Sequence, residues 1–292
     1  MAVQILKVAT LNLWGRQGPW EARRAVLRRT LEQLAPDALG LQEVIAFDAA
    51  RAPYPTDASQ SSDQARELVE GLGLYTSFGA ALDLGFGYSF GNAIVSRFPI
   101  SDVETTTLPG AEGAEPRALI SAMLQAPFGP VPFFSTHLAW KFDEGALRMR
   151  QVIAIASAVD RRQKSAEFPA VLVGDFNAEP ESDEVRFLRG LHTHGGTSTY
   201  FIDAFGEVGE GDGASFSHKN AFAAAVGEPD RRIDYVFVRG RDSRGWGRPQ
   251  RCALGCHESG EPSAGAPAVF GSDHFGVVAE LTIPKFAEGA IA

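Results

Sequence analysis

Short apolar runs alternate with amphipathic segments in the first part of the chain, and this pattern predicts strands and helices in turn. Residues 5–14 (ILKVATLNLW) are largely apolar on both faces of an extended chain, which is typical of a central strand in a covered sheet. Residues 20–34 repeat apolar side chains at helical spacing with arginines elsewhere, so they predict an amphipathic helix. Residues 37–44 (DALGLQEV) predict a second strand, and residues 63–72 predict a second helix.

From residue 92 onward, several strand-like runs follow one another with only Gly- and Pro-containing turns between them, as in consecutive antiparallel strands. The predicted strands are 92–100, 117–125, 131–140, 169–173, 233–240 and 275–283. The predicted helices are 145–162 and a short one within 181–190. The segments predicted to be loops are 48–62, 206–231 and 240–272.

No repeat, low-complexity tract or linker-like break divides the 292 residues, so we expect one domain over residues 1–292, with helices packed outside sheets. The net charge of −9 argues against a protein that coats nucleic acid, but leaves open an enzyme that acts on it. The sequence has no signal-peptide pattern and no apolar run long enough to span a bilayer, so we expect a cytoplasmic protein. Nothing in it indicates an obligate protein partner.

The two cysteines are too few for a disulfide framework. Cys252, Cys256 and His257 lie close together in the sequence, but one such cluster without a second is a weak zinc signal. We expect free thiols in a loop-rich segment.

Polar or ionisable residues stand at the ends of the predicted strands, where an unpaired buried carboxylate would cost several kcal/mol. The stretch AVLVGDFNAEP (170–180) is the clearest case, because Asp175 and Asn177 directly follow a buried strand. Each such residue alone has an ordinary role, as a turn former, a cap or a satisfied histidine. The other positions of this kind are Asn12, Glu43, His137, Asp234, Asp273 and His274.

Together these residues predict a particular chemistry. Their carboxylate and amide oxygens suit Mg²⁺, or else Mn²⁺ or Ca²⁺, rather than zinc. Two histidines beside a hard cation supply acid–base groups that titrate near neutral pH, and the combination points to hydrolysis of a phosphate ester. Because no serine or cysteine stands in a nucleophile-elbow sequence, attack by water is favoured over a covalent intermediate.

The ordered motifs LNLWG, LQEV, GNAIVSRFP, STHL, GDFNAEP, RRIDYVFVR and SDHFGVVAEL resemble those of the endonuclease/exonuclease/phosphatase superfamily. The resemblance runs from residue 7 to 283, and GDFN followed by SDH is its most specific part. It implies an α/β fold, a four-layer α-β-β-α sandwich of two mostly antiparallel sheets with outer helices. It also implies a metal-dependent hydrolase of phosphate esters.

The resemblance assigns roles one residue at a time. Glu43 matches the principal metal carboxylate, Asn12 the nearby metal-site amide, and Asp273 a carboxylate near the metal. Asp175 and Asn177 match the pair that orients or deprotonates the attacking water and holds the phosphoryl oxygen. We expect both of these side chains to face an active-site cleft.

The remaining matched positions face the phosphate. His137 matches the histidine of the deoxyribonuclease-like branch, and Asp234 matches the carboxylate that orients His274, which contacts the scissile phosphate. Arg117 and Asn92 stand where members often place phosphate-binding or substrate-side groups. For Arg117, the alternative is a solvated charge at a strand edge.

The substrate is less well determined. Seven arginines and a tryptophan within residues 231–251 predict a clamp for DNA or RNA, or alternatively a solvated loop. Residues 214–229, with His218 and Asn220, are the nearest candidate for a lipid-contacting loop, but no loop is rich in Trp or Phe that would be exposed. We therefore expect a phosphodiesterase, most readily a nuclease. The alternatives are a phosphomonoesterase or a sphingomyelinase-like lipid phosphodiesterase, and a non-catalytic binding protein is disfavoured because the set of site residues is intact.

Overall fold

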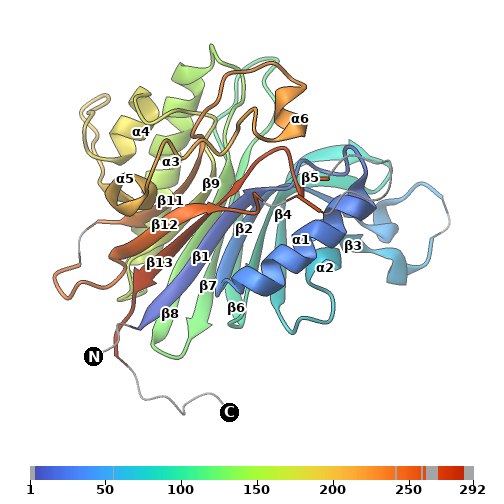
Figure 1. The fold of residues 1–292 in the computed structure, drawn as a ribbon, viewed down its shortest axis with the longest axis horizontal. Coiled ribbons are helices and arrows are strands. Elements are labelled where there is room, and N and C mark those ends of the chain that lie inside the picture. The colour runs from blue at the N-terminus through green and yellow to red at the C-terminus, as the bar shows by residue number, and fades with distance from the viewer. Residues whose placement is uncertain (1–3, 55, 241, 258, 261–268, 286–292) are drawn as a thin grey trace.

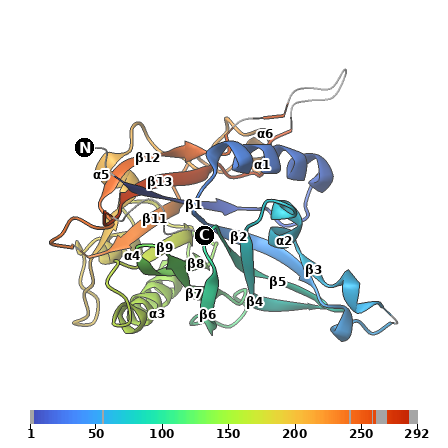
Figure 2. The ribbon, with the colours of Figure 1, turned by 90° about the horizontal axis from the view of Figure 1, so that it is seen from below.

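The computed structural model describes residues 4–54, 56–240, 242–257, 259–260 and 269–285. Two sheets lie face to face, and Figure 2 shows α1 (Trp20–Leu34) on one side of the stack and α3 (Gly145–Gln163) on the other. The four-layer α-β-β-α sandwich predicted from the sequence is confirmed.

One sheet contains, in spatial order, β12 (Pro249–Gly255), β13 (Gly276–Thr282), β1 (Ile5–Asn12), β2 (Ala38–Phe47), β5 (Tyr88–Ser96) and β4 (Tyr75–Gly85), with β3 (Ser62–Asp63) paired to β2 (Figure 1). The other contains β10 (Phe201–Asp203), β11 (Asp234–Arg239), β9 (Val171–Asp175), β8 (Gly129–His137), β7 (Ala118–Ala126) and β6 (Ile100–Thr107). Among the strand pairs of the described residues, only β1–β2 and β8–β9 are parallel, so both sheets are mostly antiparallel. The shorter helices are α2 (Gln64–Val69), α4 (Asp183–Leu188), α5 (Ala204–Val208), α6 (Ala221–Ala224) and the 3₁₀ turns η1 (Ala49–Arg51) and η2 (Ala58–Gln60).

The main core lies between the sheets, where Val8, Phe133 and Val173 are fully buried. Burying a side chain of this size contributes roughly 1.5–3 kcal/mol. At Gly40 the two sheets approach so closely that an added Cβ would lie 2.3 Å from Val173 Cγ2. Separate clusters pack α3 and α1 onto the outer faces. In the described part of the chain, no helix has the length and apolar character needed to cross a bilayer.

The apolar pattern of the sequence did not predict the strands that are mostly polar or exposed. Strands β4 and β6 lie at the edges of their sheets, and apart from Gly79 none of their residues is buried, so they carry no continuous apolar signal. Strand β12 buries only part of its length and lies within the loop expected at 240–272. The strand expected at 92–100 is the second half of β5, which ends before Pro99.

Candidate active site

Strand register brings the predicted site residues together at one end of the sandwich. Asp175 pairs across β9 with His137 on β8 and with Asp234 on β11, so the three form a row. On the facing sheet, Asn12 ends β1, and Glu43 lies in a β2 bulge with a left-handed φ of +54°. Such strained backbone is common where a side chain is aimed at a functional site.

These residues surround a cavity of about 350 Å³. Its lining includes six of the predicted residues together with Arg117: Glu43, His137, Asp175, Asn177, Asp273 and His274. Asn12 and Asp234 are buried behind this lining. Asn92 is also outside it, because its amide donates to the Ala118 carbonyl (2.8 Å) and so joins the two sheets.

The turn that follows β9 holds the side chains of Asp175 and Asn177 in place. Asn177 adopts a left-handed φ of +48°, which asparagine tolerates better than most residues. Its backbone N–H donates to Asp175 Oδ1 at 2.9 Å. Asp175 lines the cavity, as predicted, but is only 1% exposed, so its carboxylate reaches the cavity with little contact with bulk water.

Asn12 links the two sheets at the base of the cavity. Its Nδ2 donates to Asp175 Oδ2 at 3.0 Å and to Glu43 Oε1 at 3.1 Å, and its Oδ1 accepts from the Trp14 backbone N–H at 2.8 Å. Burial would raise the pKa of Asp175, but the neighbouring histidines and the Asn12 bond lower it below its ordinary value. Asp175 is therefore a carboxylate at neutral pH.

His137 is held in its neutral form. Burial first, and then the positive charge of Arg117, lowers the pKa of His137 to about 3. Arg117 Nη1 lies 3.3 Å from His137 Nδ1, and because a guanidinium only donates, Nδ1 must accept. The ring proton then sits on Nε2, 3.5 Å from the acceptor Asp175 Oδ2. Asn177 Nδ2, 3.0 Å from Nε2, is itself a donor, and it donates to the Leu138 carbonyl at 3.3 Å instead.

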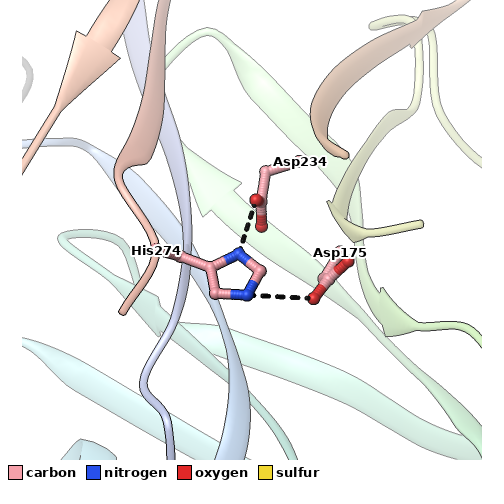
Figure 3. A group of neighbouring side chains, drawn as sticks. All are labelled: Asp175, Asp234 and His274. Carbon is pink, nitrogen blue, oxygen red and sulfur yellow. Dashed lines mark hydrogen bonds and ion pairs between the residues drawn. The ribbon is translucent and has the colours of Figure 1, made fainter. Parts of the chain in front are cut away.

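His274 is in the opposite state. Its Nδ1 lies 2.8 Å from Asp234 Oδ2, and its Nε2 lies 3.8 Å from Asp175 Oδ2 (Figure 3). Burial would lower the pKa of His274, but Asp234 and Asp273 outweigh it and raise the pKa well above the ordinary value. The expectation that both histidines titrate near neutral pH is therefore wrong, because one faces an arginine and the other faces carboxylates.

The residues present fit a hard divalent cation at Glu43 and Asp273. Burial, and then the charge of Asp273, raises the pKa of Glu43 to about 7, and the positive charge of His274 offsets this rise only in part. Asp175, Asp234 and His274 also offer ligand atoms within 4.8 Å of one another. We assign those three to hydrogen bonding instead, because Asp234 already engages Nδ1 of the protonated His274.

The structure does not support the arginine clamp, one of the two interpretations that the sequence left open for residues 231–251. Strand β11 runs away from the site, so Arg239 and Arg244 lie at the far end, where they pair with Asp160 and Glu167. Arg232 is buried against Asp203 in a bidentate pair. Among the arginines of residues 231–251 that the structure describes, only Arg231 lines the cavity; Arg241 lies outside the described residues.

Other predicted contacts also prove structural. Asn220 is buried, caps α6 and donates to the Ser272 carbonyl at 2.7 Å. His218 pairs with Asp230 on the exposed surface. Cys252 and Cys256 are free and buried in clusters on opposite faces of the sheet, and burial raises both thiol pKa values to about 12, so they form no zinc site.

Sequence reasoning missed the outer lining of the cavity. Trp140 and Val226 are half exposed there, and two ion pairs flank the cavity, Arg117–Glu115 at 3.1 Å and Arg231–Glu228. Arg117 and Arg231 were named from the sequence, but their acidic partners were not. Trp140, three residues after His137, and Glu115, two residues before Arg117, stood close enough to a motif to be found.

Comparison with known proteins agrees with this geometry. A family model of the endonuclease/exonuclease/phosphatase family matches residues 9–274, so the chain belongs to that family and is a phosphoester hydrolase. The family generally depends on divalent metal. A search of curated proteins found no match to this chain.

Solved structures share the fold at low identity. A truncated Caenorhabditis elegans TDP2 is 18% identical, with 95% of this chain and 97% of that chain covered and a TM-score of 0.67. The mannosyl-6-phosphatase of Bacteroides thetaiotaomicron is also 18% identical, with 95% and 100% covered and a TM-score of 0.70. The catalytic domain of human Nocturnin is 17% identical, with 96% and 95% covered and a TM-score of 0.60.

Proposed function

We propose that this protein hydrolyses phosphate esters, diesters above all, by attack of a water molecule in the presence of Mg²⁺, with Mn²⁺ or Ca²⁺ as alternatives. One observation carries the proposal: the buried carboxylate Asp175 stands between a neutral His137 and a cationic His274, on the wall of one cavity. This arrangement offers a proton acceptor and two hydrogen-bond donors within a few ångströms.

Glu43 and Asp273 would hold the cation, with Asn12 orienting Glu43 from behind. When bound there, Mg²⁺ would supply positive charge that stabilises the negative charge of the phosphoryl group during hydrolysis.

The chain's own groups supply the rest. Asp175 accepts the proton of the attacking water, because its lowered pKa keeps it ionised. His274 Nε2–H and His137 Nε2–H donate to phosphoryl oxygens, where negative charge grows during the reaction. Asp234 holds the imidazolium of His274 in place, and Arg117 holds His137 by donating to its Nδ1.

The substrate follows from the cavity rather than from the arginine run. A nuclease loses its main support, since Arg232, Arg239 and Arg244 pair with acids and none of them lines the cavity. A cavity of about 350 Å³ suits one phosphoester group with its nearest substituents. We therefore propose a compact phosphodiester as substrate and keep DNA or RNA as the comparison case.

The test compares bis(p-nitrophenyl) phosphate, p-nitrophenyl phosphate and supercoiled plasmid, each with Mg²⁺ and with EDTA. We expect the small diester to be cleaved fastest, and EDTA to abolish turnover. Asp175→Asn should lower kcat by roughly 10²–10⁴-fold, the usual contribution of a positioned acid–base group. Asp203→Asn is the matched control, because Asp203 is an equally buried aspartate whose partner is Arg232. Near-normal turnover in Asp175→Asn would contradict the proposal.

A further inference from the structure

Exposed apolar side chains gather at the end of the sandwich that holds the cavity. Trp140 and Val226 line the cavity itself, and the Phe142 ring lies 4.5 Å from the guanidinium of Arg231, another lining residue. On the other side, Phe90 of β5 lines the cavity, and the β4–β5 hairpin continues outward from it. The exposed apolar residues at this end are Leu84, Phe86, Tyr88, Trp140, Phe142 and Val226.

The hairpin tip presents an aromatic residue at a conformational cost. Phe86 and Gly87 form a two-residue turn with φ values of +54° and +86°, as in a type I′ turn. A bulky residue with positive φ is an outlier, and asparagine is preferred at this position. Phe86 occupies this position and is 69% exposed. Neither the turn conformation nor packing in the core therefore accounts for a phenylalanine here.

The tip is also held firmly. The Asp48 backbone N–H donates to the Gly87 carbonyl at 2.9 Å, and an added Cβ on Gly87 would lie 2.7 Å from Asp48 O. Arg51 and Asp83 form an ion pair at its base. Because the backbone is anchored on one side, the exposure of Phe86 is a fixed feature of the surface and points to a partner.

The charges around the cavity favour an apolar partner over a polyanion. Arg117 pairs with Glu115, Arg231 with Glu228, and Arg51 with Asp83. The chain carries a net charge of −9. Phosphate backbones bind through cations that release counterions, and these arginines are already neutralised by acids. Exposed Trp, Tyr, Phe and Leu are residues that enter a lipid–water interface. Here Leu84, Phe86 and Tyr88 stand at the hairpin tip, and Trp140 stands at the cavity.

We propose that the cavity end of this protein docks on a zwitterionic lipid surface. The hairpin tip on one side and Trp140 and Phe142 on the other enter the interface, which presents a lipid headgroup phosphodiester to Asp175. This inference rests on the proposed function and names its substrate class. The exposed aromatic residues of this surface are distant in sequence, so no single loop of the sequence predicted them.

The experiment is co-sedimentation of the full chain with phosphatidylcholine vesicles. The test variant is Phe86→Asn combined with Leu84→Ser. Asparagine before Gly87 suits the turn, so this variant should fold at least as well while losing the apolar tip. We expect its ratio of bound to free protein to fall about ten-fold. Tyr75→Ser is the control, because Tyr75 is 48% exposed at the opposite end of the same strand β4.

Binding of the unaltered protein should change little between about 0.1 and 0.5 M salt, since charge does not drive it. The proposal is overturned if the unaltered chain does not bind vesicles, if the double variant binds equally well, or if Tyr75→Ser reduces binding as much. It is also overturned if the double variant loses binding to a single-stranded DNA instead. Hydrolysis of bis(p-nitrophenyl) phosphate in the same samples should be equal for all three proteins. Normal hydrolysis without vesicle binding defeats this proposal alone, whereas absent hydrolysis defeats the proposed function.

Discussion

Replacing Arg117 by methionine should change the state of His137. Arg117 Nη1 lies 3.3 Å from His137 Nδ1, and both side chains are less than 5% exposed. The fall of the His137 pKa from 6.5 to about 3 corresponds to about 5 kcal/mol against protonation. Burial is the largest cause and Arg117 the second, so Arg117→Met should raise this pKa by roughly one to two pH units.

The sign of the effect on activity follows from Asp175. A protonated His137 would pair with Asp175 Oδ2, 3.5 Å away, and make that carboxylate a weaker acceptor of the water proton. In the unaltered protein this loss begins only near pH 3. In Arg117→Met it should begin at higher pH, so the acid limb of kcat/KM should move upward.

Two measurements check this reasoning. The pH dependence of kcat/KM with bis(p-nitrophenyl) phosphate should show the shifted acid limb. Nitrogen-15 NMR of the imidazoles should show that His137 is protonated on Nε2 in the unaltered protein and is a mixture of tautomers in the variant. Glu115→Gln is the control, because it removes the ion-pair partner of Arg117 but leaves the contact with His137. An Nδ1 proton on His137 in the unaltered protein would refute the assignment.

Two further changes test other parts of the structure. Asp234→Asn removes a charge that raises the His274 pKa, so His274 should lose its proton at lower pH and the alkaline limb of kcat should move down. An unchanged limb would mean that His274 does not act as a cation. Gly40→Ala would place a Cβ 2.3 Å from Val173 Cγ2 and 2.8 Å from Ser135 Oγ, and such overpacking should destabilise the fold by about 1–3 kcal/mol. Urea denaturation measures this loss, and unchanged stability would show that the sheets can separate at this point.

The site was predictable because its residues stand at strand ends. Asp175 and Asn177 follow an apolar strand that must be buried, and a carboxylate in that position needs a partner or a functional role. The parallel pairs β1–β2 and β8–β9 then bring the ends of four strands to one edge. The sequence motifs and the strand topology therefore place the site residues at the same positions, since both depend on where each apolar strand ends.

Other features depend on distances that no local pattern contains. The sequence motifs give no reason to distinguish His137 from His274. In the structure, His137 faces Arg117, 20 positions earlier in the chain, and His274 faces Asp234, 40 positions earlier. The arginine run looked like a clamp because it flanks Asp234 in sequence. In the structure the direction of β11 carries Arg239 and Arg244 away from the cavity and into ion pairs.

The sequence by itself therefore determined the family through its ordered motifs, and that resemblance implied the two-sheet architecture and the residues that meet at the cavity. The apolar pattern added where most of the strands lie, because buried strands must be apolar. Tertiary structure alone decided which histidine is charged, which arginine reaches the cavity and which aromatic residues stay exposed. Protonation depends on burial and on the sign of the nearest charge, and exposure depends on which neighbours the fold supplies. Both are set only when segments far apart in the chain come together.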